Sequence, residues 1–337
     1  MKSHAQNVPL PTQAPLAGSE RIVDISIILT TRNRADSLRD TLAGLAATSL
    51  PPHTATEFIL VDNGSTDRTR EVALGFRWPG VETRLLHLAE PGIARARNAA
   101  VQHSHGRVLI FIDDDVGVPV DWISRMSEPI LSGDADAVGG GVRIPAEFKP
   151  AWATSDHEEW LASTAHWEDS REPVLVGASM AIGRPAFEAV GGFNESLMHG
   201  EDTLLSYMIV AAGLRLVLRH DIIVDHHLLP SRFSRRGFAE QAVRRAEWHA
   251  FEVVHWERRR LRFPHLCWIR ARWRLARLRG RQPHSLADSS LTGAEMRLMQ
   301  EIAFWPAYLR RRGEPECFDR RGARLAFANE RRSSEAK

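Results

Sequence analysis

Three consecutive carboxylates, Asp113, Asp114 and Asp115, directly follow the apolar run Val108–Ile112. Adjacent like charges repel each other, and the end of a buried strand leaves them little freedom to separate. A divalent cation would turn this repulsion into attraction. Mg²⁺ or Mn²⁺, held by one or two carboxylates and by substrate phosphates, suits the arrangement better than an EF-hand calcium loop, whose glycine position is occupied by Val118. The alternative interpretation is a solvated junction between a strand and a turn.

Other residues that could do chemistry stand in short polar clusters. Asp62, in the sequence VDNGSTD, could accept a hydrogen bond from a base or a ribose hydroxyl, or could belong to an ordinary turn. Arg97 stands in the first turns of an expected helix, where a cation opposes the helix dipole and a nearby phosphate would relieve the conflict. Glu201 and Asp202 begin another expected helix, where acids also suit the dipole without any function. His226 follows an expected strand and offers a metal ligand or a structural imidazole.

These clusters follow elements that would bring them together. Strand-like segments at 24–31, 57–65, 83–88 and 107–112 alternate with helix-like segments. The strands are continuously apolar, which predicts an α/β fold with a mainly parallel sheet covered on both faces. Ligands bind at the carboxyl edge of such sheets. The segments expected to converge at that edge are Thr30–Arg34, Asp62–Asp67, Glu90–Arg97 and Asp113–Asp115.

Composition and absent motifs narrow the class of protein. The 337 residues include two cysteines and no apolar run long enough to span a bilayer, which favours a cytoplasmic location. No GxxxxGK[ST], GxGxxG, HExxH or CxxC motif occurs, so a P-loop NTPase, a dinucleotide dehydrogenase and a zincin lose support. Between Arg232 and Arg281 there are 15 Arg and 4 Glu, a net charge of +11, whereas the whole chain carries +2. The sequence therefore predicts an acidic body with a basic appendage.

Taken together and in order, six segments resemble the family 2 glycosyltransferases of the GT-A fold. They are ILTTRNR (28–34), FILVDNGSTDRT (58–69), GIARARNAAVQHSHGRVLIFIDDD (92–115), GASMAIGRPAFEAVGGFNESL (177–197), GEDTLLSYMIVAAG (200–213) and VDHH (224–227). The resemblance implies a GT-A domain at 22–230, with a Rossmann-like nucleotide-binding half at about 22–120 and an acceptor half at about 121–230. A disordered segment is expected at 1–21 and a basic helical region at 231–337.

The resemblance also implies roles for individual residues. Nucleotide contacts are implied for Thr30, Arg32, Arg34, Asp62, Arg97, Asp113 and Asp114. Asp113 and Asp115 look like the ends of the DxD motif that holds the metal, with His226 as a further ligand. Gly177, Ala178 and Ser179 look like the loop beside the acceptor, although many members of the family have Asn at the last position. Asp202 sits where the family keeps its catalytic base, paired with Glu201.

The expected activity is a metal-dependent, inverting glycosyl transfer that uses Mn²⁺ or Mg²⁺. The expected donor is a UDP-, dTDP- or GDP-sugar, and the expected acceptor is a hydroxyl of a glycan or of a lipid-linked molecule, in bacterial polysaccharide, glycolipid or related glycoconjugate synthesis. One alternative is a non-catalytic nucleotide- or sugar-binding module at a membrane surface. Another is a sugar nucleotidyltransferase, which would need a glycine-rich signature that TTRNRADS lacks.

The basic appendage predicts a peripheral contact with an anionic membrane, at the inner face. In FPHLCWIRARWRLARLRGR, one helical face is approximated by Leu266, Ile269, Trp273 and Leu278, and arginines occupy much of the rest. The alternative is a helix that packs this apolar face on the catalytic domain. Nucleic-acid binding, with Trp side chains stacking on bases, has the least support.

Overall fold

The computed structural model describes residues 23–167, 173–280 and 291–315. The segment 1–21, expected to be disordered, lies outside the described residues. Contacts divide the chain into two compact units. The sheet unit comprises the chain up to Arg143 together with Trp167–Ser196 and Glu201–His227, and the helical unit comprises Ile144–His166, Leu197–Gly200 and the chain from Leu228. Residues 144–166, expected within the acceptor half, thus group with the C-terminal helices.

The described strands of the sheet unit form one mixed sheet. They are β1 (Ile25–Thr31), β2 (Thr56–Asp62), β3 (Glu82–His87), β4 (Val108–Ile112), β5 (Val116–Gly117), β6 (Ala137–Arg143), β7 (Ser179–Gly183) and β8 (Leu216–His226). Their order across the sheet is β3-β2-β1-β4-β7-β6-β8-β5. The first four strands run parallel, as does β6 beside β8, whereas β7 is antiparallel to β4 and β6. The predicted α/β class with a mainly parallel sheet is confirmed.

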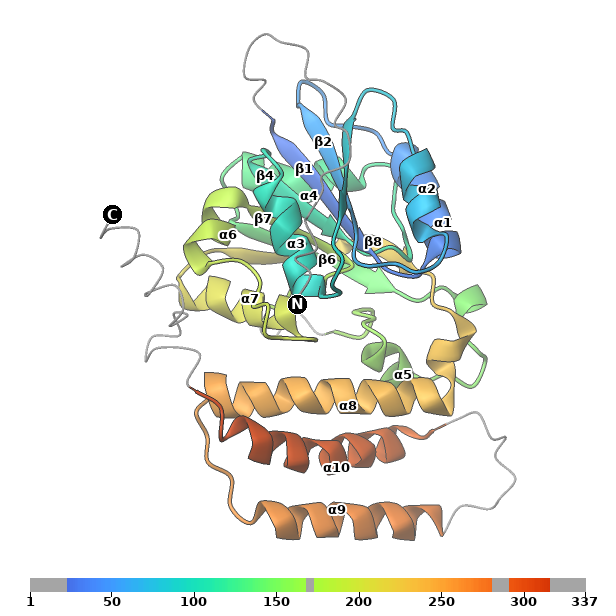
Figure 1. The fold of residues 1–337 in the computed structure, drawn as a ribbon, viewed down its shortest axis with the longest axis vertical. Helices are drawn as coiled ribbons and strands as arrows, with labels where there is room; N and C mark the ends of the chain where they lie inside the picture. The colour runs from blue at the N-terminus through green and yellow to red at the C-terminus, as the bar shows by residue number, and fades with distance from the viewer. Residues whose placement is uncertain (1–22, 168–172, 281–290, 316–337) are drawn as a thin grey trace, which may run out of the picture. The chain divides into compact units, whose positions relative to one another are not determined.

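Helices cover both faces of the sheet. They are α1 (Ala35–Ala46), α2 (Thr69–Gly75), α3 (Ile93–Gln102), α4 (Trp122–Leu131), α6 (Arg184–Val190) and α7 (Glu201–Ala211). Helices α1 and α2 lie on one face and α3 and α6 on the other (Figure 1). For α1, α2 and α3, which link parallel strands, right-handed crossovers require this arrangement. Leu38, Leu42 and Leu45 of α1 stand at helical spacing, and all three are buried in the core that α1 shares with β1 and β4.

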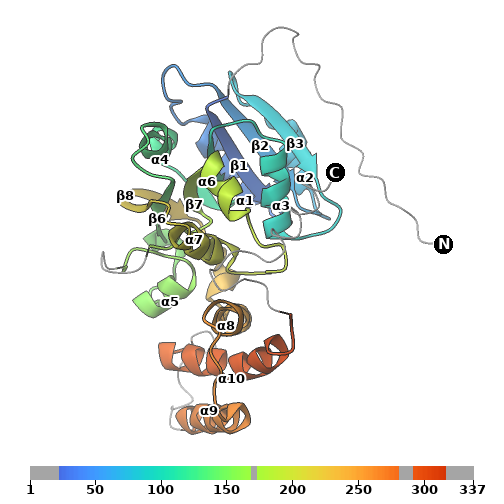
Figure 2. The ribbon, with the colours of Figure 1, turned by 90° about the vertical axis from the view of Figure 1, so that its left-hand side faces the viewer.

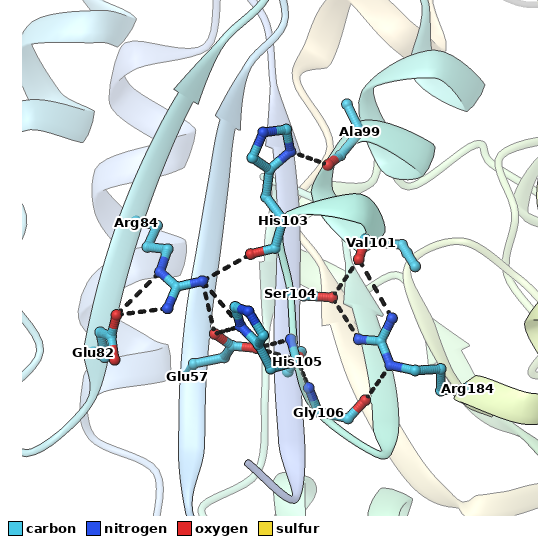
Figure 3. Close-up of polar contacts among 11 residues, drawn as sticks. Glu57, Glu82, Arg84, Ala99, Val101, His103, Ser104, His105, Gly106 and Arg184 are labelled. Atoms are coloured by element: carbon cyan, nitrogen blue, oxygen red, sulfur yellow. Dashed lines mark hydrogen bonds and ion pairs between the residues drawn. The ribbon is translucent and has the colours of Figure 1, made fainter. Parts of the chain in front are cut away.

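A buried carboxylate fastens the amino edge of the sheet. Glu57, near the start of β2, is 1% exposed. Its Oε1 accepts hydrogen bonds from Ser26 Oγ at 2.6 Å and from the backbone N–H of His105 at 2.5 Å, and Arg84 Nη1 lies 3.5 Å from its Oε2 (Figure 3). Gly106 lies beyond the end of α3 and just before β4. A Cβ there would lie 2.3 Å from the backbone nitrogen of Ser26, so close packing requires glycine at this position.

The helical unit contains α5 (Ser155–Trp160), α8 (Arg235–Phe251), α9 (Pro264–Arg279) and α10 (Gly293–Arg311), with short 3₁₀ segments at Ala146–Phe148 and Pro230–Phe233 and a π-helical turn at Glu252–Trp256. Helix α10 lies between α8 and α9 (Figures 1 and 2). Side-chain caps define the starts of two of these helices, since Ser234 accepts from the Gly237 N–H and Thr292 forms a capping box with Glu295. No helix in the described ranges is long and apolar enough to cross a bilayer.

Candidate active site

The carboxyl edge of the parallel strands gathers residues from distant parts of the sequence. Strand β1 ends at Thr31, β2 at Asp62 and β4 at Ile112, and the register of these parallel strands brings their ends to one edge of the sheet. The antiparallel strand β7 begins with Ser179 opposite Ile112, so the loop at 177–178 reaches the same edge. The predicted convergence of these segments is therefore present.

The pairing of β5 with β8 adds a histidine to the carboxyl edge of the sheet. Strand β5 pairs with β8 so that Val116 stands opposite His226. The backbone N–H of His227 donates to the carbonyl oxygen of Asp115 at 2.8 Å. This pairing brings the imidazole of His226 beside the acidic trio.

The three adjacent carboxylates turn to three different sets of partners. Asp114 Oδ2 accepts a hydrogen bond from Thr31 Oγ1 at 2.6 Å. Asp115 Oδ2 lies 2.5 Å from Arg34 Nη1, and its Oδ1 lies 3.2 Å from His226 Nε2. Asp113 is held by a separate arginine, described below. Thr31 belongs to the segment Thr30–Arg34 expected at this edge, but no individual role was predicted for it.

Burial and charge give the three carboxyl groups different affinities for protons. Burial and the charge of Asp115 raise the pKa of Asp114 to about 7. Burial also raises the pKa of Asp113, against the opposing effect of Arg97. Burial acts in the same direction on Asp115, but His226 and Arg34 outweigh it and lower the pKa of Asp115 below its usual range. Asp115 is therefore the member of the trio that most readily stays ionised.

Arg97, which is 2% exposed, joins two acidic groups that are distant in sequence. Its Nη2 donates to Asp113 Oδ1 at 2.9 Å and its Nη1 donates to Glu201 Oε1 at 2.9 Å. Burial would lower the pKa of Arg97, but the surrounding carboxylates outweigh it and raise the pKa. The conflict with the helix dipole that we expected a phosphate to relieve is thus relieved by carboxylates of the protein.

Glu201 and Asp202 open helix α7 in different environments. Glu201 is buried against Arg97, and burial together with the charge of Asp202 raises its pKa to about 7. Asp202 is partly exposed; its Oδ2 accepts from the Gly177 N–H at 3.0 Å and its Oδ1 from the Thr203 N–H at 2.7 Å. The loop before β7 therefore orients a carboxylate that stays accessible and could accept a proton.

The residues expected to contact the nucleotide differ in accessibility. Asp62 is fully buried, and its carboxylate contacts the Ser65 N–H at 3.0 Å and His87 Nδ1 at 2.9 Å. His87 was missed from the sequence, although it ends β3 and so stands at the same edge. Thr30 is 8% exposed within β1. Arg32 is exposed and has no polar partner in the described part of the chain.

The three residues expected beside the acceptor do not share one environment. Ala178 and Ser179 are 1% and 0% exposed, and Ser179 Oγ accepts from Trp122 Nε1 at 3.0 Å. Their side chains face the core, so they are not available to an acceptor. Gly177 holds Asp202 through its N–H, and a Cβ at Gly177 would lie 2.5 Å from Arg97 Nη2. A side chain at this position would therefore have to displace the Arg97 guanidinium from its contacts with Asp113 and Glu201.

The chemistry of the donor set fits a divalent cation. Asp113, Asp115 and His226 offer carboxylate oxygens and an imidazole, ligands that Mn²⁺ accepts. His226 is 7% exposed, and its buried Nδ1 has no hydrogen-bond partner among the described residues. Within those residues, no group of three or more His, Cys, Asp or Glu is arranged to hold a metal ion unaided. The described residues alone therefore do not complete a metal site.

Residues 26–191 match the family model described as glycosyl transferase family 2. Glycosyltransferase AglE of Haloferax volcanii is 26% identical over 208 residues, which are 61% of this chain and 67% of that protein. Succinoglycan biosynthesis protein ExoM of Rhizobium meliloti is 35% identical over 222 residues, which are 64% of this chain and 71% of that protein.

A solved structure supports the same assignment at the level of the fold. The mannosyltransferase PcManGT of Pyrobaculum calidifontis, determined in complex with GDP-Man and Mn²⁺, aligns with a TM-score of 0.52 at 19% identity. The alignment covers 98% of this chain and 82% of that one. At this identity the likeness bears on the fold alone. On the family match, the relatives and the shared fold, this chain is a glycosyltransferase of the GT-A fold and belongs to glycosyltransferase family 2.

Proposed function

We propose that the chain moves a sugar from a nucleotide-sugar donor to an acceptor hydroxyl, with inversion at the anomeric carbon and dependence on Mn²⁺ or Mg²⁺. The observation that carries this proposal is the accessible carboxylate of Asp202, oriented by the Gly177 N–H. Through Glu201 and Arg97, its helix is tied to Asp113 at the end of β4. One network thus joins a group able to accept a proton to the acids expected at the donor.

On the donor side, the carboxyl edge would bind the nucleoside. Asp62 and Asp114 are buried acceptors at the ends of β2 and β4, and Thr30 lies in the strand between them. The donor would be a UDP-, dTDP- or GDP-sugar. The structural neighbour's complex with GDP-Man supports a nucleotide sugar in general. Arg32, exposed beside this edge, could reach the diphosphate.

Asp113, Asp115 and His226 would hold the divalent cation. Arg34 fixes one oxygen of Asp115, and His226 lies beside the other. When bound, the cation supplies charge that offsets the negative charge developing on the departing nucleoside diphosphate. The Mn²⁺ in the neighbour's complex supports this assignment.

Asp202 would act as the general base. Its carboxylate accepts the proton of the acceptor hydroxyl as the oxygen attacks the anomeric carbon from the side opposite the leaving group. A single displacement of this kind inverts the configuration. Arg97 would be a positioning residue, since its guanidinium is buried and both of its terminal nitrogens contact carboxylates. Glu201 would act through Arg97 in the same way.

We further propose a glycan or lipid-linked acceptor, used in polysaccharide, glycolipid or related synthesis, at a cytoplasmic location near the inner face of the membrane. The name of the succinoglycan biosynthesis relative supports a polysaccharide role. The sequence and its charge pattern support the location, as argued from the basic appendage above.

The test begins with melting temperatures of the full chain against a panel of UDP-, dTDP- and GDP-sugars, with and without Mn²⁺. One nucleotide class should raise the melting temperature, and more so with Mn²⁺. The stabilising donor is then incubated with simple glycoside acceptors, and the anomeric configuration of the product is read by NMR coupling. Retained configuration would refute the mechanism. Stabilisation without any transfer would support a binding module, and pyrophosphate release from a nucleoside triphosphate and a sugar phosphate would support a nucleotidyltransferase.

A further inference from the structure

Helix α9 and the residue that precedes it expose large apolar side chains in a short stretch. Phe263, Leu266, Ile269 and Trp273 are 70%, 53%, 57% and 61% exposed. Twelve large apolar side chains are exposed in the described part of the chain, and these four fall within eleven residues. Exposed apolar clusters of this kind mark contact surfaces on proteins.

The apolar stripe lies opposite the side that packs on the helical unit. Ala271 and Leu275 are the buried residues of α9, and α9 packs on α10 (Figures 1 and 2). Trp273 is two residues from each of them, which is a rotation of about 200° around the helix. Leu266 and Ile269 precede Trp273 by seven and four residues and so share its outer face. The helix therefore turns a small side toward its neighbour and its bulkiest side chains outward. Leu278, expected on the same face, is instead half-buried.

The flanks of this stripe are strongly basic. Residues 258–279 contain nine Arg and no Asp or Glu. Arg274 and Arg279 reach Glu301 and Glu295 of α10. Arg270, Arg272 and Arg277 have no carboxylate partner among the described residues. The last two stack on tryptophans of the same helix instead, with Arg272 4.7 Å from the ring of Trp268 and Arg277 5.3 Å from that of Trp273.

We propose that this outer face of α9 docks the protein on an anionic lipid bilayer. A helix with Leu, Ile and Trp on one face and arginines on its flanks lies in the plane of the bilayer interface, with its apolar face among the acyl chains and its cations at the headgroups. The docking surface consists of Leu266, Ile269 and Trp273, with Arg270 and Arg277 at its edge. The inference is independent of the chemistry proposed for the sheet unit.

Charge complementarity favours a bilayer over the other occupants. A second copy of the chain that paired through the same face would set arginines against arginines. Segment 316–337 carries five Arg and one Lys against one Asp and three Glu, so it also has a net positive charge. Neither occupant supplies the negative charge that the surface lacks, whereas an anionic lipid headgroup does.

The first test removes the apolar contact. The full chain is sedimented with phosphatidylcholine vesicles that contain or lack 30% phosphatidylglycerol, at low and high salt. The triple variant Leu266→Ser, Ile269→Ser, Trp273→Ser should bind anionic vesicles about tenfold more weakly or worse. The matched control Val210→Ser, Val217→Ser removes exposed apolar side chains from the sheet unit and should bind as the wild type does. All sites are exposed, and unchanged melting temperatures verify folding.

The second test removes charge. Arg270→Gln with Arg277→Gln should weaken binding to anionic vesicles by about 25-fold at low salt, at roughly fivefold for each arginine. The control Arg107→Gln with Arg236→Gln removes two exposed arginines elsewhere and should have little effect. Equal binding of the wild type to anionic and neutral vesicles, or no binding to either, overturns the proposal. A triple apolar variant that binds anionic vesicles like the wild type also overturns it. If that variant has at the same time lost self-association, the surface pairs two copies of the chain instead.

Discussion

The replacement Asp202→Asn separates an enzyme from a binding module. It keeps the size of the side chain but removes the proton acceptor. The two oxygens of Asp202 accept from the N–H groups of Gly177 and Thr203. An amide offers one oxygen and one NH₂ group, so one of these two hydrogen bonds is lost in either orientation. At this partly exposed position, the loss should cost about 1 kcal/mol of stability, and the melting temperature should fall by only a few degrees.

The expected loss of rate is larger than the loss of stability. If Asp202 is the general base, kcat should fall by about 10² to 10⁴-fold, which corresponds to roughly 3 to 5 kcal/mol in the transition state. Donor affinity should change little, because proton transfer belongs to the transition state alone. A loss of kcat much larger than the loss of stability would identify Asp202 as the general base. A residue that merely fixed the loop would lose stability and rate together.

The assay measures donor consumption and product formation at saturating nucleotide sugar, with donor affinity determined by calorimetry. Asp221→Asn is the matched control, because Asp221 is an exposed aspartate of β8 paired with Arg125 and Arg219. It should lose at most about 1 kcal/mol of stability and keep its turnover. An Asp202→Asn protein that works within a few-fold of the wild-type rate would refute the assignment, as would a product with retained configuration.

Three further outcomes are expected. Mn²⁺ should strengthen nucleoside diphosphate binding in the wild type, the nucleotide should strengthen Mn²⁺ binding by the same factor, and Asp115→Ala should abolish this coupling in calorimetry. The pKa of Glu201 is raised from 4.5 to about 7, so its contribution to stability is present below pH 4.5 and is lost as the pH rises to about 7. Glu201→Gln should therefore gain stability over the wild type across that window, by up to about 3 kcal/mol, in melting curves at pH 4.5 and pH 7.5. Glu57→Ala should leave Ser26 and His105 without their acceptor and lower the free energy of unfolding by about 2 to 4 kcal/mol, measured by denaturant unfolding. Donor affinity should be unchanged, because Glu57 lies at the amino edge of the sheet and the candidate site lies at the carboxyl edge.

Much of the sheet could be predicted because its strands carry local signals. Continuous apolar runs such as Val108–Ile112 are typical of strands buried on both faces, and polar residues mark the points where they end. That reasoning placed Asp113–Asp115 at the carboxyl edge, together with Asp62. The same rule applied to every strand would also have identified His87, which ends β3.

The environment of Ser179 and the partners of Arg97 could not be predicted, because they depend on contacts between residues that are distant in the sequence. Ser179 stands in a strand whose residues are all buried, so no alternation in the sequence revealed that its hydroxyl faces Trp122 rather than an acceptor. The partner of Arg97 across the site, Glu201, is 104 residues away and belongs to another helix. Neither pairing leaves a local pattern, because side-chain contacts across a sheet follow from the packing of whole elements.

The acidic site contains more carboxyl groups than positively charged groups. Asp113, Asp114, Asp115, Glu201 and Asp202 are five carboxyl groups, and the guanidinium groups that contact them come from Arg34 and Arg97. Both arginines are committed to single oxygens of their partners, so neither compensates the trio as a whole. A buried carboxylate without a compensating charge is costly. The site nevertheless gathers these five carboxyl groups around two guanidinium groups, with His226 beside Asp115. A fold that served only its own stability would gain by replacing one of these acids with a neutral residue. The excess of negative charge is intelligible if a cation and the diphosphate it carries belong to the working state of the site.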